Sequence, residues 1–263
     1  MLIESAPPDA VPAPPQGPEF KLLSGPPAYR RIAPWRPISI VGTAVVLLVV
    51  AVIWANIYSS MHELKKPEID DTFVALTLIF TPIQQLIMIG LAVWAAYAHG
   101  GDVVDALALR APAQGWRAYV GCIGLYLLAV IVMGAALHYL QPGSNDADTD
   151  PFKKLLTSPY AWAAMLLVGV GAPLSEELLF RGYLFRWIAQ TPLGVVGAAV
   201  GSSAFFSLMH SYSVIGMTQV FVIGMIFSWI LVRTGSLRVT MLIHAIYNSV
   251  LAVLLMIGAD SWV

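Results

Sequence analysis

Long apolar stretches are the feature that most constrains how this chain can fold. A transmembrane helix needs about 20 mainly apolar residues to cross the hydrocarbon core of a bilayer, and the sequence contains seven stretches of about that length. They run from Ile38 to Tyr58, Phe73 to Ala98, Trp116 to Leu137, Tyr160 to Ile188, Leu193 to His210, Val214 to Val232 and Leu237 to Ile257. The pattern predicts an all-α fold, a polytopic membrane bundle of about seven transmembrane helices. The fourth stretch is longer than one crossing requires, so a break near Pro173 would add an eighth, re-entrant element.

The overall composition excludes the ordinary soluble classes. Hydrophobic residues make up 58% of the 263 residues and charged residues 11%, whereas soluble domains are roughly half apolar and about a quarter charged. The net charge is -1 and the basic residues are scattered at the ends of the predicted spans. Nucleic-acid binding is therefore not expected. The single cysteine, Cys122, has no disulfide partner and belongs to no paired-cysteine metal motif.

Residues 1–37 differ in composition from the rest of the chain. They hold ten of the eighteen prolines, which is too many for a helix or a packed core. We therefore predict two parts: a disordered, proline-rich tail over residues 1–37 and a transmembrane helical domain over residues 38–263.

The arginines favour one orientation in the membrane. Cytoplasmic loops of membrane proteins carry an excess of Lys and Arg. Here arginines precede the first stretch, separate the second from the third, follow the fourth, and separate the sixth from the seventh. They are Arg30, Arg31, Arg36, Arg110, Arg117, Arg186, Arg233 and Arg238. This bias predicts an integral membrane protein with its amino terminus, and the proline-rich tail, in the cytoplasm.

The fourth stretch contains a group of ionisable residues, although each one costs at least a few kcal/mol inside a bilayer. Glu177 and Arg181 are four residues apart and share one face of a helix, so their spacing predicts a buried ion pair that braces the helix. Glu176 is rotated by about 100° from Glu177 and is left free to face a cavity. A carboxylate in such a cavity is suited to act as a general base.

Two later stretches carry one deep histidine each. At 1.5 Å per residue, Glu176 lies about 18 Å and His210 about 24 Å from the turn that joins their helices, so we expect the two side chains to meet. Phe206 lies one turn before His210 and is expected to pack beside the imidazole. His244 and Asn248 share a face of the last helix, with a looser match in depth to Glu176. This pair fits two donors to an oxyanion, and it fits equally a histidine metal ligand supported by an amide.

Each of these residues also has a structural explanation. Histidines and asparagines can join membrane helices by hydrogen bonds, and a Glu–Arg pair can be purely structural. The deep ionisable residues are nevertheless confined to three stretches, which favours one shared functional site. Rival intramembrane chemistries lack their motifs: the sequence has no His-Glu-x-x-His zinc helix, no Gly-x-Ser-x-Gly elbow and no pair of intramembrane aspartates.

Three short motifs, each on its own stretch, carry a resemblance to a known family. They are Glu176-Glu177-x-x-x-Arg181, Phe206-x-x-x-His210 and His244-x-x-x-Asn248. Together they resemble the signature of the CAAX prenyl protease and bacteriocin-processing (CPBP, Abi-type) family of intramembrane endopeptidases. The resemblance covers about residues 159–252, which we predict to be the catalytic core.

The resemblance implies hydrolysis of a peptide bond and gives each motif a role. Activation of water falls to Glu176 and His210, stabilisation of the oxyanion to His244 and Asn248, and support to Glu177, Arg181 and Phe206. The cofactor stays open. A divalent metal such as zinc would find ligands in Glu176, His210 and His244, whereas a Glu/His pair works without a metal.

The resemblance also implies partners and a location. We expect the lipid bilayer and a membrane-associated peptide or protein substrate as partners, and the bacterial inner (plasma) membrane as the location. Two alternatives remain: a non-catalytic membrane scaffold or bacteriocin-immunity protein of the same fold, and a small transporter. Transporters usually show internal repeats, and this sequence shows none.

Overall fold

The computed structural model describes residues 71–100, 102–140, 146–210 and 212–258. The predicted tail and the first predicted span lie outside these residues. The described part of the chain contains helices and no strand, so the predicted all-α fold is confirmed there. Five of its helices are long and apolar enough to cross a membrane. They are Asp71–Ala98, Trp116–Ala136, Ala161–Ile188, Val214–Thr234 and Leu237–Met256.

The fifth predicted span is shorter than expected. Its helix, α9, runs over Gly194–Leu208 and has 15 residues, which gives a length of about 22 Å at 1.5 Å per residue. The chain then turns into α10 (Val214–Thr234), where the Ser213 side chain caps the helix by accepting a hydrogen bond from the Gly216 N–H. The prediction of a full span ending at His210 is therefore wrong, and His210 lies in the turn between the two helices.

The fourth predicted span is one continuous helical run, Ala161–Ile188, and it does not break at Pro173. Its register changes instead. The run consists of α6 (Ala161–Leu166), the π-helix η1 (Leu167–Gly171), α7 (Ala172–Glu176), the π-helix η2 (Glu177–Phe185) and α8 (Arg186–Ile188). The wider turns of η1 relieve the clash with the preceding turn that a proline ring makes inside an α-helix. This proline therefore produces no re-entrant element.

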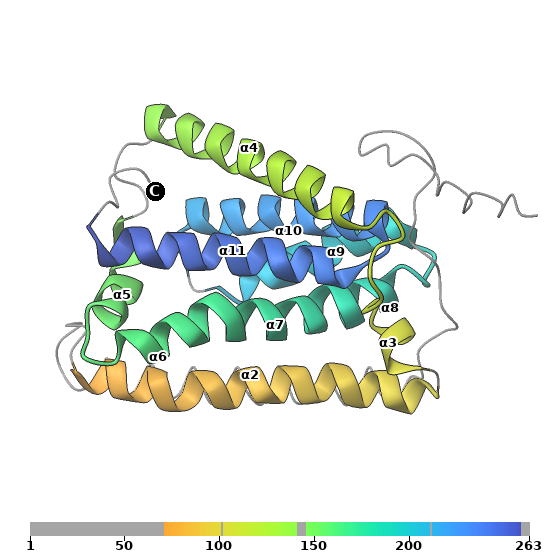
Figure 1. Ribbon diagram of the computed structural model, residues 1–263, viewed down its shortest axis with the longest axis horizontal. Helices are drawn as coiled ribbons and strands as arrows, with labels where there is room; N and C mark the ends of the chain where they lie inside the picture. Colours follow the sequence, from red (N-terminus) through yellow and green to blue (C-terminus); the bar gives the residue numbers. More distant parts are fainter. Residues whose placement is uncertain (1–70, 101, 141–145, 211, 259–263) are drawn as a thin grey trace, which may run out of the picture.

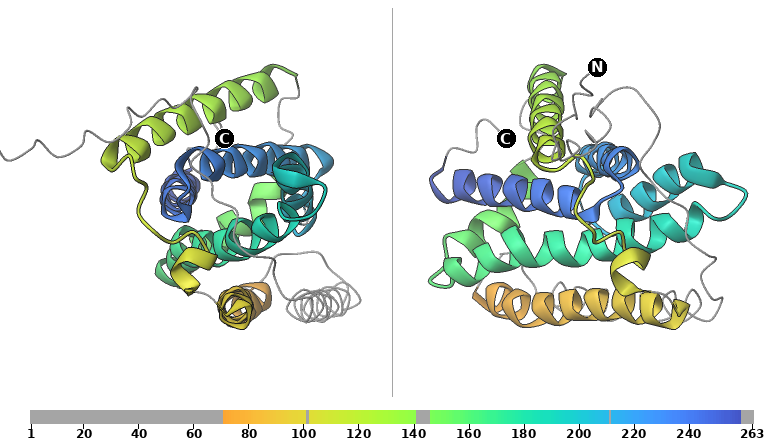
Figure 2. Two further views of the ribbon diagram at one scale, coloured as in Figure 1. Left: turned by 90° about the vertical axis from the view of Figure 1, so that its right-hand side faces the viewer. Right: turned by 45° about the vertical axis from the view of Figure 1, so that its right-hand side comes forward.

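The central run is surrounded by helices that precede and follow it in the sequence. The preceding helix α2 (Asp71–His99) packs along α7 and η2. Of the later helices, α11 (Leu237–Met256) packs along η1, α7 and η2, and α9 packs against η2. The helix α4 (Trp116–Leu140) lies outside α10 and α11. Figures 1 and 2 show α2 and α4 on opposite outer faces of the bundle. The central run thus has helices packed along several of its sides.

The two ends of the bundle are built differently. At one end the loop after α3 (Val103–Ala106) covers the turn between α10 and α11. There the Leu237 N–H donates to the Ala108 carbonyl at 2.8 Å and the Ser236 hydroxyl to the Arg110 carbonyl at 2.6 Å. Arginine-bearing loops that are far apart in the sequence therefore meet at this end. The short helix α5 (Asp146–Leu156) lies at the opposite end (Figure 1).

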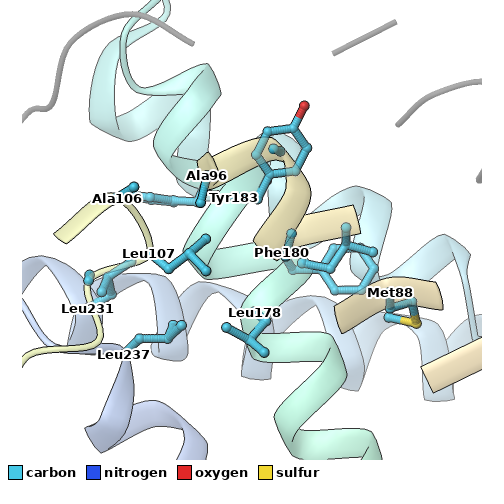
Figure 3. Packing of buried hydrophobic residues seen from close by; sticks show 14 of the residues in the cluster. Met88, Ala96, Ala106, Leu107, Leu178, Phe180, Tyr183, Leu231 and Leu237 are labelled. Carbon is cyan, nitrogen blue, oxygen red and sulfur yellow. The ribbon is translucent and has the colours of Figure 1, made fainter. Parts of the chain in front are cut away.

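The largest apolar core lies around the second half of the central run. Figure 3 shows its side chains converging from α2, the loop after α3, η2, α10 and α11. Those labelled are Met88, Ala96, Ala106, Leu107, Leu178, Phe180, Tyr183, Leu231 and Leu237. Phe180 also contacts Phe206 of α9, with ring centroids 5.1 Å apart. This core therefore fixes η2 and α9 against each other beside the polar residues of the bundle.

Candidate active site

A cavity of about 360 Å³ lies between the central run, α2, α5, α9, α10 and α11. Its wall is mainly apolar and includes several phenylalanines and methionines. The four residues expected to carry the chemistry all line it: Glu176, His210, His244 and Asn248. The fold therefore brings polar side chains from three separate predicted spans to one cavity, whose size suits a small ligand or part of a peptide.

Glu177 and Arg181 form the buried ion pair expected from their spacing. Arg181 Nη1 lies 3.0 Å from Glu177 Oε1, and both side chains are 0% exposed. The guanidinium also lies over the rings of Phe206 and Phe227, at 4.2 and 5.3 Å from their centroids. Such cation–π contacts are favourable where water is excluded. The pair is thus enclosed by aromatic rings.

His244 lies between the two glutamates. Its Nδ1 is 3.2 Å from Glu177 Oε1, and its Nε2 is 3.7 Å from Glu176 Oε2. Because an ionised carboxylate can only accept hydrogen bonds, Nδ1 carries a hydrogen that it donates to Glu177. The Glu176 side chain is 19% exposed whereas that of Glu177 is fully buried. The neighbouring carboxylates therefore occupy different environments, with Glu176 at the cavity and Glu177 behind its wall.

We expected His210 to match the depth of Glu176 better than His244 does, and this expectation is wrong. Within the described residues, the histidine within 4 Å of Glu176 is His244. A π-helix advances less per residue than an α-helix, so Glu176 lies nearer to the arginine-bearing end than an α-helical count indicates. The last helix also begins deep in the bundle, because Ser236 and Leu237 at its start are fully buried. Both effects bring Glu176 and His244 to the same depth.

His210 is held by the phenylalanine one turn before it. Its Nδ1 lies 2.8 Å from the Phe206 carbonyl oxygen, and the two rings meet edge to face with centroids 4.7 Å apart. The predicted packing of Phe206 against the imidazole is confirmed. Since a carbonyl only accepts hydrogen bonds, Nδ1 carries the hydrogen and Nε2 of the neutral ring keeps a lone pair. His210 can therefore accept a proton or a hydrogen bond through Nε2.

Asn248 reaches across to the central run. Its side-chain Nδ2 donates to the Val168 carbonyl of η1 at 3.1 Å. An amide nitrogen carries two hydrogens, so one remains after this bond. Asn248 also lines the cavity, so this residue contacts both the η1 backbone and the cavity.

Glu176, His210 and His244 are the candidate ligands of a metal ion. Within the described residues, no group of three or more His, Cys, Asp or Glu side chains is arranged to hold a metal ion. Nδ1 of His244 faces Glu177 and Nδ1 of His210 faces a backbone carbonyl, and metal-bound histidines use their second nitrogen in the same way. Both rings therefore keep Nε2 for a ligand, but Glu176, His210 and His244 do not come together around one point in this arrangement.

A family model matches the segment that carries these residues. Residues 158–250 match the Rce1-like family of type II CAAX prenyl endopeptidases. This match is consistent with the CPBP family and confirms the resemblance seen in the three motifs. No curated protein and no solved structure matches the chain. The Rce1-like segment includes all four cavity-lining motif residues and supports a protease of the CAAX type.

The Rce1-like segment also brings to the cavity residues that sequence reasoning missed. Tyr212, Gln219 and Tyr247 line the wall. The Tyr212 ring lies 5.2 Å from the His210 ring. Burial, together with the nearby Glu176 carboxylate, raises the pKa of the Tyr212 phenol well above its ordinary value, so this hydroxyl keeps its hydrogen. The sequence signal for Tyr212 is only its position two residues after His210.

Other cavity residues come from outside the Rce1-like segment, among them Asp148 and Phe152 on α5. Asp148 of α5 accepts hydrogen bonds from the Ser213 backbone N–H and hydroxyl, both at 2.7 Å. On the same helix, Phe152 meets Tyr212 edge to face, with ring centroids 6.2 Å apart. These contacts hold α5 against the turn between α9 and α10.

Proposed function

We propose that this chain is an intramembrane endopeptidase that hydrolyses a peptide bond with a water molecule activated by Glu176 and His210. The observation that supports the proposal is the cavity itself. The carboxylate of Glu176, two imidazoles and the amide of Asn248 converge there inside a bundle of apolar helices. The Rce1-like match over residues 158–250 gives the same reaction class.

The first step is attack by water on the scissile carbonyl. Glu176 takes a proton from the water as general base, while the unprotonated His210 Nε2 accepts the second hydrogen of that water and orients it. The water oxygen forms a bond to the carbonyl carbon, and the carbonyl oxygen becomes an oxyanion. Water-excluding apolar walls strengthen each of these electrostatic contacts.

The oxyanion is stabilised by donors from the last helix. Asn248 has one amide hydrogen left after its bond to Val168, and His244 presents Nε2 on the Glu176 side of the cavity. With His244 protonated, Glu176, Glu177, Arg181 and His244 carry no net charge together, which lowers the cost of burying them. Preorganised donors of this kind contribute about 3–4 kcal/mol each to transition-state stabilisation.

The second step releases the products. The carbon–nitrogen bond breaks, and the proton that Glu176 took from the water passes to the leaving nitrogen. The products are a carboxylic acid and an amine, and Glu176 returns to its ionised form. No other reactant is required.

The substrate class follows from the location of the cavity. Five apolar helices surround or flank it, so a substrate reaches it from the bilayer or from the membrane surface. We infer a membrane-associated peptide or protein substrate, with the arginine-bearing end of the bundle in the cytoplasm and the bacterial inner membrane as location. A non-catalytic scaffold of the same fold would bind such a peptide without cleaving it, and this is the alternative to be tested.

The test is comparative peptidomics of membrane and secreted peptides from cells that express the wild type or Glu176→Gln at matched levels. A peptide processed by the wild type alone is expected, because the amide cannot act as a base. The matched control is Asp150→Asn, which neutralises an exposed carboxylate of α5. It is expected to process the peptide like the wild type. Processing that survives in a folded Glu176→Gln protein would exclude Glu176 as the base. Peptide pools that do not differ between wild-type cells and cells lacking the protein would favour the scaffold.

A further inference from the structure

The backbone of η1 leaves one carbonyl without a helical donor. In this π-helix the Ala172 N–H donates to the Leu167 carbonyl, five residues earlier. The next donor in the same register is the nitrogen of residue 173, and its acceptor is the Val168 carbonyl. Residue 173 is proline, which has no N–H. The Val168 carbonyl is therefore available to a donor from another helix.

Asn248 supplies that donor. Its Nδ2 lies 3.1 Å from the Val168 carbonyl oxygen. A carbonyl accepts and never donates, so this bond decides which end of the Asn248 amide faces η1. Without such a partner an asparagine amide has two nearly equivalent orientations, which exchange its donor and acceptor ends.

The neighbouring helices are built to come close to η1. A Cβ atom at Gly169 would lie 2.6 Å from Ser249 Oγ, and one at Gly171 would lie 2.1 Å from Gln85 Oε1. A larger residue at either position would force these side chains to move, so both glycines permit close approach to the η1 backbone. Gln85 uses this approach as Asn248 does, because its Nε2 donates to the Leu167 carbonyl at 2.9 Å.

We propose that Pro173 and the Val168 carbonyl are positioning groups that orient Asn248 for catalysis. By removing the backbone donor, Pro173 reserves the Val168 carbonyl for the Asn248 amide. The second amide hydrogen is then fixed toward the cavity, where a substrate oxyanion forms. The catalytic consequence rests on the proposed protease function, whereas the contact itself does not.

The contact is tested by NMR in the full chain. The sequence has three asparagines, Asn56, Asn145 and Asn248, so selective ¹⁵N labelling of asparagine side chains gives three amide signals. Asn248→Asp removes one and thereby assigns it. Pro173→Ala restores an N–H at residue 173 that competes for the Val168 carbonyl. One side-chain amide proton of Asn248 donates to the Val168 carbonyl, and we expect the NMR signal of this proton to shift upfield in the variant.

The matched control is Pro82→Ala, which removes the proline inside α2. It is expected to leave the Asn248 signal unchanged. If Pro173→Ala does not fold, the wild type still decides the matter. With ¹³C at valine carbonyls, solid-state NMR is expected to show magnetisation transfer between the Asn248 side-chain nitrogen and one valine carbonyl. No transfer in the wild type, or an unchanged Asn248 signal in folded Pro173→Ala, would overturn the proposal.

Kinetics separate positioning from a general loss of structure. Once peptidomics has supplied a substrate, Pro173→Ala is expected to lower kcat about tenfold or more with KM unchanged, because an oxyanion donor acts in the transition state. A rise in KM at unchanged kcat would contradict the positioning role. If the wild type shows the contact and cleaves no peptide, the protease function fails while the contact stands.

Discussion

Replacing Arg181 by methionine should destabilise the fold strongly, because it leaves Glu177 buried without its closest cation. The two side chains are 3.0 Å apart and neither is exposed. Removing one partner of a buried pair costs about 3–5 kcal/mol. Loss of the cation–π contacts with Phe206 and Phe227 adds about 1 kcal/mol. We therefore expect Arg181→Met to lower the free energy of unfolding by about 4–6 kcal/mol.

The assay is reversible unfolding in mixed micelles with increasing SDS, followed by circular dichroism. The control is Arg110→Met, because Arg110 is paired with Asp102 and Asp105 on the exposed surface, where ion pairs contribute little to stability. The double variant Glu177→Gln with Arg181→Met should recover part of the loss, since it removes the unpaired charge. An effect of Arg181→Met no larger than that of Arg110→Met would refute the reasoning, as would additivity in the double variant.

Two further predictions use the same purified protein. Gly224→Ala should lower the free energy of unfolding by about 1–3 kcal/mol through overpacking, because its Cβ would lie 2.8 Å from a side-chain atom of α9. The control Gly90→Ala, whose Cβ would have nothing within 4 Å, should change stability by no more than about 1 kcal/mol. Equal effects of the two substitutions in the unfolding assay would contradict this prediction. Single cysteines at the exposed positions Ala113 and Thr157 should react with a membrane-impermeant maleimide from the cytoplasmic and the opposite side, respectively. Cys122 is buried and should stay unlabelled, and labelling of both positions from one side would overturn the predicted orientation.

Local pairs within one helix could be predicted from the sequence. Glu177 and Arg181 meet because residues four apart are neighbours on a helical surface, and Phe206 contacts His210 for the same reason. The predicted spans that fall on described residues also agree with helices there except at α9, whereas α3 and α5 were not predicted. The two side-chain pairs follow from their four-residue spacing, and the helices follow from the length of the apolar stretches.

Contacts between helices depended on a depth count that failed. The count assumed 1.5 Å per residue throughout and a turn at the membrane surface before each helix. The π-helix η2 violates the first assumption, and the buried turn at Ser236 violates the second. Asp148 and Tyr212 were missed for a different reason, since nothing local in the sequence indicates that α5 packs against the turn before α10.

The buried start of α11 and the position of His244 both depend on one glycine. Gly182 follows Arg181 in η2, and a Cβ there would lie 3.1 Å from Leu237 Cδ2 and 3.4 Å from Leu107 Cδ2. A glycine therefore allows the start of α11 to sit against η2 beneath the loop after α3. This depth is what places His244, two turns further along α11, beside both glutamates. The glycine next to the buried arginine thus acts through packing on the geometry of the carboxylates, although it touches neither of them.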